Sequence, residues 1–246
     1  MNAIIFFTRI PSPISSAYNE KRMSRCMIYL PMVGWLVGGF GALVFWEAQH
    51  FLPRTIALML SMLSTIILTG AFHEDGMADF CDGFGGGWTK ERVLEIMKDS
   101  RLGTYGAVGL WATLFIKWLS LNELNIQKIY FTIIAGHVLS RLFATTFMLT
   151  HDYVREASTS KSAPLCFQIS KPQFLFMAIT GLFPLLFFQD KKIFLCLLPL
   201  ALIHLFLGSL WKKKIGGFTG DCLGAAQQIS EVVFYLYVIG YLWTST

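Results

Sequence analysis

The sequence has few charged residues for its length. Charged residues make up 14% of the 246 residues, whereas hydrophobic residues make up 54% and aromatic residues 15%. The mean hydropathy of +0.56 is above that of an ordinary soluble domain of this size. This composition excludes a soluble domain and predicts a polytopic membrane protein.

Cysteine pairs and repeats are also missing. The five cysteines form no Cys-x-x-Cys pair, which argues against a zinc site and against a disulfide framework. We therefore expect the cysteines to be structural. The chain contains no internal repeat, no low-complexity tract and no soluble domain, and nothing in it indicates nucleic-acid binding. The sequence predicts one membrane-embedded domain over residues 1–246.

Seven apolar windows have the length of about 17 to 25 residues that a bilayer demands. They cover residues 28–49, 55–72, 104–121, 129–150, 173–189, 193–211 and 229–243. Lys and Arg concentrate in alternate segments between the windows, which places the N-terminus and those segments in the cytoplasm. We expect an all-α integral membrane protein with about seven transmembrane helices and its active-site loops on the cytoplasmic face.

One of these inner segments carries the clearest functional signal. Asp75, Asp79 and Asp82 lie at i, i+4 and i+7, so their carboxylates project from one face if the segment is helical. Three like charges held together need neutralising. Mg²⁺ prefers oxygen ligands and often shares its shell with substrate phosphates. The pattern therefore predicts a Mg²⁺ site that binds a phosphate compound.

Glycines and basic residues follow the acids. Gly85 and Gly86 are candidates to offer backbone N–H groups to phosphate oxygens, although a glycine-rich turn alone is weak evidence and no Walker-type sequence follows. Thr89 is a plausible N-cap for an amphipathic surface helix. At the end of that helix, Lys98 and Arg101 would return toward the acids and bind substrate. The alternative is a solvated connector.

A second inner segment also combines glycines with an acidic residue. Residues 216–225 place several glycines around Asp221 at the start of a predicted helix. Alone, this is a tight turn and a helix cap, but together with the first acids it predicts the other half of the phosphate site. Arg141 lies inside an apolar window, where a charge usually faces a partner or a cavity. Arg141, His137 and Arg155 would together form a cationic wall opposite the acids. The alternative is that Arg141 is a structural arginine.

Four segments resemble one known family in the same order along the chain. They are residues 7–13, 72–83, 94–103 and 216–225, and they closely resemble the cobalamin synthase family, the adenosylcobinamide-GDP ribazoletransferases. The resemblance extends from Thr8 to Glu231. One departure is Glu74, where an apolar residue is expected, and it leaves open whether Glu74 joins the metal shell or points away.

The resemblance implies a reaction and a location. The enzyme would join alpha-ribazole, or its 5′-phosphate, to adenosylcobinamide-GDP and release GMP, with Mg²⁺ as cofactor, at the inner face of the bacterial cytoplasmic membrane. No protein nucleophile is needed for this transfer. Asp75, Asp79, Asp82 and Asp221 would hold Mg²⁺, and one of them would accept the hydroxyl proton. Substrate would be bound by His73, Lys98, Arg101, Arg141, Gly85 and Gly86.

Two other functions remain as alternatives. A CDP-alcohol phosphotransferase of phospholipid synthesis also uses Asp-Gly-rich motifs near a membrane, although the glycines at 85–87 interrupt its pattern here. A cation transporter would need its acids at mid-membrane depth. The sequence leaves open a homo-oligomer and docking of other cobamide-assembly enzymes.

Overall fold

The structure, a computed structural model, describes residues 2–11, 26–154 and 169–243. Within these ranges the chain is helical, apart from an isolated parallel bridge between Tyr153 and Phe218. The elements are α1 (Asn2–Phe7), η1 (Met27–Tyr29), α3 (Leu30–Ala48), α4 (Arg54–Thr69), α5 (Phe72–Gly86), α6 (Lys90–Ile96), α7 (Thr104–Asn122), α8 (Ile126–Thr150), α9 (Lys171–Leu182), η3 (Phe183–Phe187), η4 (Lys191–Cys196), α10 (Leu197–Ile215) and α11 (Gly220–Trp243). Arg155, named above, lies outside the described residues.

Helices form at all seven predicted windows, but fewer of them could cross a membrane. Among the described residues, four segments are long and apolar enough, and α4 with α5 make a fifth if that bent pair is one span. The four are Met27–Ala48, Ile126–Thr150, Lys191–Ile215 and Gly220–Tyr241. The expected seven spans are therefore not confirmed. Helix α9 illustrates the reason, because its 12 residues reach only about 18 Å, short of the roughly 30 Å hydrocarbon core.

A sharp bend separates α4 from α5. The two helices meet at 89°, and the residues between them, Gly70 and Ala71, have left-handed backbones with φ of +65° and +56°. Such residues end a helix, and glycine adopts this conformation without strain. The backbone N–H of Arg9 donates to the Leu68 carbonyl at 2.7 Å, beside the bend. The acidic segment, whose spacing allowed a helix, is a separate helix that packs inside the bundle.

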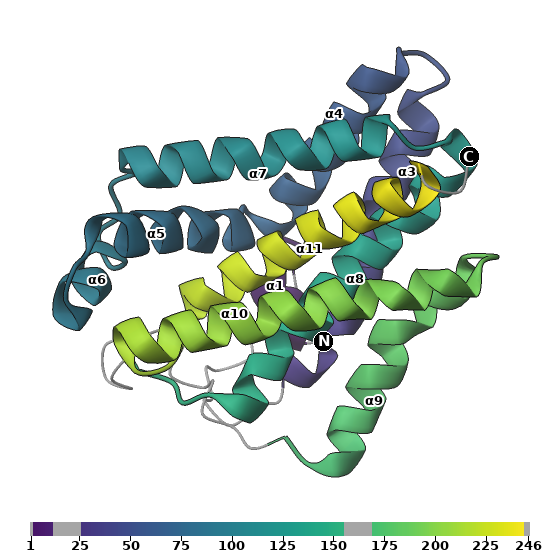
Figure 1. The fold of residues 1–246 in the computed structure, drawn as a ribbon. Helices are drawn as coiled ribbons and strands as arrows, with labels where there is room; N and C mark the ends of the chain where they lie inside the picture. The colour runs from purple at the N-terminus through teal and green to yellow at the C-terminus, as the bar shows by residue number, and fades with distance from the viewer. Residues whose placement is uncertain (1, 12–25, 155–168, 244–246) are drawn as a thin grey trace.

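Helix α5 packs between α7 and α11 (Figure 1). On the other side of the molecule α3 packs closely against α8, because Gly34 lets the two backbones approach. A Cβ at Gly34 would lie 2.6 Å from the His137 carbonyl oxygen. Of the cysteines that the structure describes, Cys26, Cys196 and Cys222 are buried and Cys81 is partly buried.

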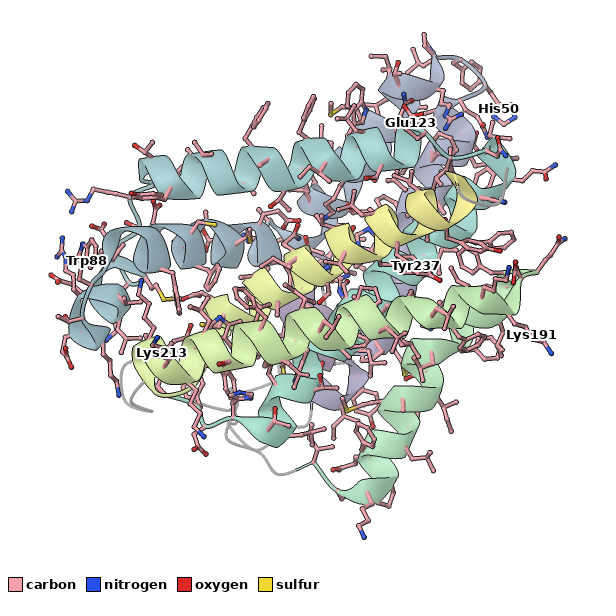
Figure 2. All side chains as sticks on the ribbon, viewed as in Figure 1. His50, Trp88, Glu123, Lys191, Lys213 and Tyr237 are labelled. Atoms are coloured by element: carbon pink, nitrogen blue, oxygen red, sulfur yellow. The ribbon has the colours of Figure 1, made fainter. Side chains whose placement is uncertain are left out.

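Charged and polar residues mark the two ends of the bundle. Figure 2 shows Trp88 and Lys213 at one end, and His50, Glu123 and Lys191 at the other. This separation follows the predicted division into inner and outer segments. Helix α5 ends and α11 begins at the Lys213 end (Figure 1). That this end faces the cytoplasm stays a prediction.

Candidate functional site

The two acidic motifs meet where α5 contacts α11. A Cβ at Gly76 would lie 3.1 Å from Cα of Asp221 and 3.2 Å from Cα of Gly224, so the two helix backbones touch there. Asp75 and Asp79 lie on α5 on either side of Gly76, and Asp221 lies in the first turn of α11. The packing therefore brings together two motifs that are far apart in the sequence.

Three of these carboxylates are accessible. Asp75 is exposed, while Asp79 and Asp221 are half-buried. In the part of the chain that the structure describes, no group of three or more His, Cys, Asp or Glu side chains is arranged to hold a metal ion. Mg²⁺, however, is usually bound by one or two carboxylates together with waters and substrate phosphates. This set of acids therefore does not form a protein cage for an ion, and an ion shared with substrate stays a prediction.

The close contact at Gly76 leads to a prediction about stability. Replacing Gly76 with Val should push α5 away from α11 and destabilise the protein by about 1–3 kcal/mol, the usual cost of overpacking. Thermal unfolding in nanodiscs measures this loss. The control is Gly39→Val on α3, because a Cβ at Gly39 has no neighbour within 4 Å. Equal unfolding temperatures for the two variants would contradict the close contact.

The structure gives Asp82 a different position from the other acids. It is 9% exposed, and its two carboxylate oxygens accept the backbone N–H groups of Gly103 at 2.7 Å and Gly106 at 2.8 Å. Since these N–H groups belong to the start of α7, Asp82 acts as its cap. The sequence predicted the same role for Asp82 as for Asp75 and Asp79, because the three acids have helical spacing. Its contact with a metal stays a prediction, and the capping geometry weighs against it.

Asp82→Asn tests the capping role. The amide replaces one acceptor oxygen by an NH₂ group that faces a backbone N–H, so we expect a loss of about 1–3 kcal/mol of stability and a lower unfolding temperature. Glu95→Gln is the control, since Glu95 pairs with Arg92 on an exposed surface, where an ion pair contributes little. Loss of turnover at an unchanged unfolding temperature would instead indicate a metal ligand.

The basic residues after α6 are on the surface. Lys98 and Arg101 are exposed. The Arg101 guanidinium donates to both Asp99 oxygens, with its Nε at 3.0 Å from each. These hydrogen bonds lower the pKa of Asp99 and raise that of Arg101. Arg101 is therefore paired in the structure, and its contact with substrate stays a prediction, as does that of Lys98.

The other predicted cations lie inside the bundle. Arg141 is 2% exposed, and its Nη1 donates to the His137 carbonyl at 2.9 Å. Nδ1 of His137 in turn lies 3.7 Å from Oε2 of Glu231. These two α8 residues therefore gather near a buried acid of α11 and do not form an exposed wall. His73 is also buried, with its ring 6.3 Å from that of Phe7. Substrate contacts of His73 and Arg141 stay predictions.

Gly85 and Gly86 lie in the last turn of α5 and do not form a loop. A helix C-terminus directs carbonyl oxygens outward, which disfavours phosphate binding there. Gly85 has a packing role instead, because a Cβ at this position would lie 2.6 Å from the Tyr105 ring. Phosphate contacts of the two glycines therefore stay predictions that this geometry does not favour.

A buried polar cluster was missed by sequence reasoning. Nζ of Lys117 lies 3.1 Å from Oε1 of Glu231 and donates to Oε1 of Gln228 at 2.9 Å. The signal was present, since a charge inside an apolar window usually has a buried partner. The partners could not be paired, because they come from different helices, α7 and α11.

The fold and the acids define a class of protein: an all-helical membrane protein with an acidic site at the contact of two helices. The chain belongs to the cobalamin-5-phosphate synthase family, whose model matches residues 1–239, and is an enzyme of cobalamin synthesis. A protein of Shewanella frigidimarina named adenosylcobinamide-GDP ribazoletransferase is 45% identical over 240 residues, 96% of this chain and 92% of that protein.

Two further relatives carry the same name. The protein of Shewanella amazonensis is 41% identical over 248 residues, which cover 99% of this chain and 95% of the relative. That of Shewanella piezotolerans is 41% identical over 246 residues, which cover 98% and 95%. No solved structure matches the chain.

Proposed function

We propose that this protein is an adenosylcobinamide-GDP ribazoletransferase. It joins alpha-ribazole, or its 5′-phosphate, to adenosylcobinamide-GDP, giving adenosylcobalamin, or its 5′-phosphate, and GMP. The observation that carries this proposal is the match of nearly the whole chain to relatives of that name at 41–45% identity. The accessible acids at the α5–α11 contact support it, because they suit the transfer of a phosphoryl group.

The reaction forms one bond and breaks one. The ribazole 5′-oxygen bonds to the cobinamide-linked phosphorus, the pyrophosphate P–O bond breaks, and GMP leaves with the bond's electrons. The hydroxyl proton passes to a carboxylate among Asp75, Asp79 and Asp221. Because charge builds on phosphoryl oxygens, positioning and electrostatic stabilisation are what the protein must supply.

Mg²⁺ is the cofactor that these acids fit. A bound Mg²⁺ would neutralise negative charge on the pyrophosphate oxygens. Asp75, Asp79 and Asp221 are the residues that would hold it, because their carboxylates are accessible and flank one contact between two helices. Asp82 would contribute by fixing the start of α7 next to α5.

Cations near this end of the molecule would bind the nucleotide. Lys98 and Arg101 are exposed in the segment that leads into α7, so they are free to approach the leaving GMP if Arg101 exchanges Asp99 for phosphate. Lys214 also lies close, since its Nζ donates to the Phe84 carbonyl at 2.6 Å. The protein would work in the bacterial inner membrane, with this end in the cytoplasm.

A comparison of two substrate sets tests the function. Protein in nanodiscs is incubated with adenosylcobinamide-GDP and alpha-ribazole, or with CDP-diacylglycerol and an alcohol acceptor, and the released nucleotides are separated. The proposal expects GMP from the first set and no CMP from the second. CMP without GMP would identify a CDP-alcohol phosphotransferase instead. Cation uptake by sealed vesicles without either product would indicate a transporter.

A further inference from the structure

Glu74 is a buried acid on the same helix turn as the accessible Asp75. It is 8% exposed, and its Oε1 accepts a hydrogen bond from Nε2 of Gln228 at 2.9 Å. Gln228 lies on α11 one turn beyond Gly224, which touches Gly76 of α5. The hydrogen bond therefore joins the two acid-bearing helices next to their backbone contact.

The groups around this hydrogen bond hold it in one arrangement. The Gln228 amide also accepts from Lys117, and Lys117 pairs with Glu231. Two buried acids, Glu74 and Glu231, thus share the interior with two cations, Lys117 and Arg141. A shift of one helix against the other would break hydrogen bonds of this network, and each polar group left unpaired in the interior is costly.

Glu74 also lines a small cavity. Oε2 is buried and has no hydrogen-bond partner among the described residues. The cavity has a volume of about 10 Å³ and a mixed lining, with polar side chains such as Thr65 and Lys117 and apolar ones such as Leu114 and Ile133. A space of roughly this size accepts one water molecule where two to four polar partners line it. The cavity offers these partners, so a single water fits it.

We propose that Glu74 is a positioning residue for the acidic site. It binds Gln228 through one oxygen and one buried water molecule through the other, and so holds α5 in register with α11. That register sets where Asp75 and Asp79 lie relative to Asp221. The effect on turnover rests on the proposed function, whereas the effect on helix register does not.

The test uses Glu74→Leu, Gln228→Leu and the double variant. Each single variant should lower kcat by about 10- to 100-fold, as displaced reacting groups do, and leave KM for both substrates within about twofold. The double variant should be no worse than either single variant, because the two side chains act through one hydrogen bond. The proposal would be overturned by an unchanged kcat or by a raised KM alone. It would also be overturned if the loss of kcat in the double variant were the product of the two single losses.

A conservative variant and two structural measurements distinguish lost positioning from misfolding. Glu74→Gln keeps an oxygen for Gln228 and should retain kcat within a few-fold; a loss as large as that of Glu74→Leu would contradict positioning. Amide exchange in residues 72–86 should rise in Glu74→Leu and Gln228→Leu, even if the wild-type protein proves to have another substrate. A cryo-EM map should show water at Oε2 of Glu74, and an empty cavity would refute the water.

Discussion

Asp221→Asn should lower turnover by at least about 100-fold while the protein stays folded. Asn has the size of Asp but no negative charge, so it binds a divalent cation and accepts a proton far less well. The loss of one preorganised electrostatic contact commonly costs 10²- to 10³-fold in kcat. Asp221 is half-buried in the first turn of α11, where the change removes no buried volume. GMP release per folded protein measures the effect.

A matched control lies at the other end of the bundle. Asp190 precedes Lys191, which Figure 2 shows far from Lys213, so Asp190→Asn should retain full turnover. Asp75→Asn should resemble Asp221→Asn, because both acids flank the Gly76 contact. Wild-type turnover in well-folded Asp221→Asn would show that α11 contributes no acid to the reaction.

Lys117→Met should cause the largest loss of stability. Lys117 and Glu231 form an ion pair at 3.1 Å, and their side chains are only 6% and 2% exposed. Removing the cation leaves Glu231 charged without this partner, and breaking a buried pair in this way costs about 3–5 kcal/mol. Thermal unfolding in nanodiscs, or the yield of folded protein if the loss is that large, measures the effect.

The double variant Lys117→Met, Glu231→Gln is the control. It removes both charges, so its stability should return most of the way to that of the wild type. Lys128→Met changes a lysine outside the cluster, in the first turn of α8, and should cost little. A double variant less stable than Lys117→Met alone would argue against a direct ion pair.

Much of the helical framework could be predicted from apolar periodicity and capping residues. Thr89 begins α6, and its side chain accepts the Arg92 N–H at 3.3 Å, as its position before the amphipathic run indicates. Asp221 lies at the start of a helix, as the surrounding glycines predict. Local features of this kind depend on neighbours in the sequence, which is why they can be read from it.

The features that depend on packing could not be predicted. The sharp bend between α4 and α5 was not predicted, because the left-handed backbone of Ala71 has no signature in the sequence. Asp82 has the same helical spacing as its neighbours, yet the N–H groups that hold it come from α7. The same is true of Glu74, which departs from the expected apolar residue and binds Gln228 of α11.

Metal-dependent product formation tests whether the acids at the α5–α11 contact bind Mg²⁺ for the transfer. Wild-type protein in nanodiscs is incubated with adenosylcobinamide-GDP and alpha-ribazole in Mg²⁺, in EDTA, and in EDTA followed by excess Mg²⁺, and products are separated by chromatography. We expect equal amounts of complete cobamide and GMP in the first and third samples and none in the second. Equal product formation with and without EDTA would contradict a Mg²⁺-dependent acidic site at the α5–α11 contact.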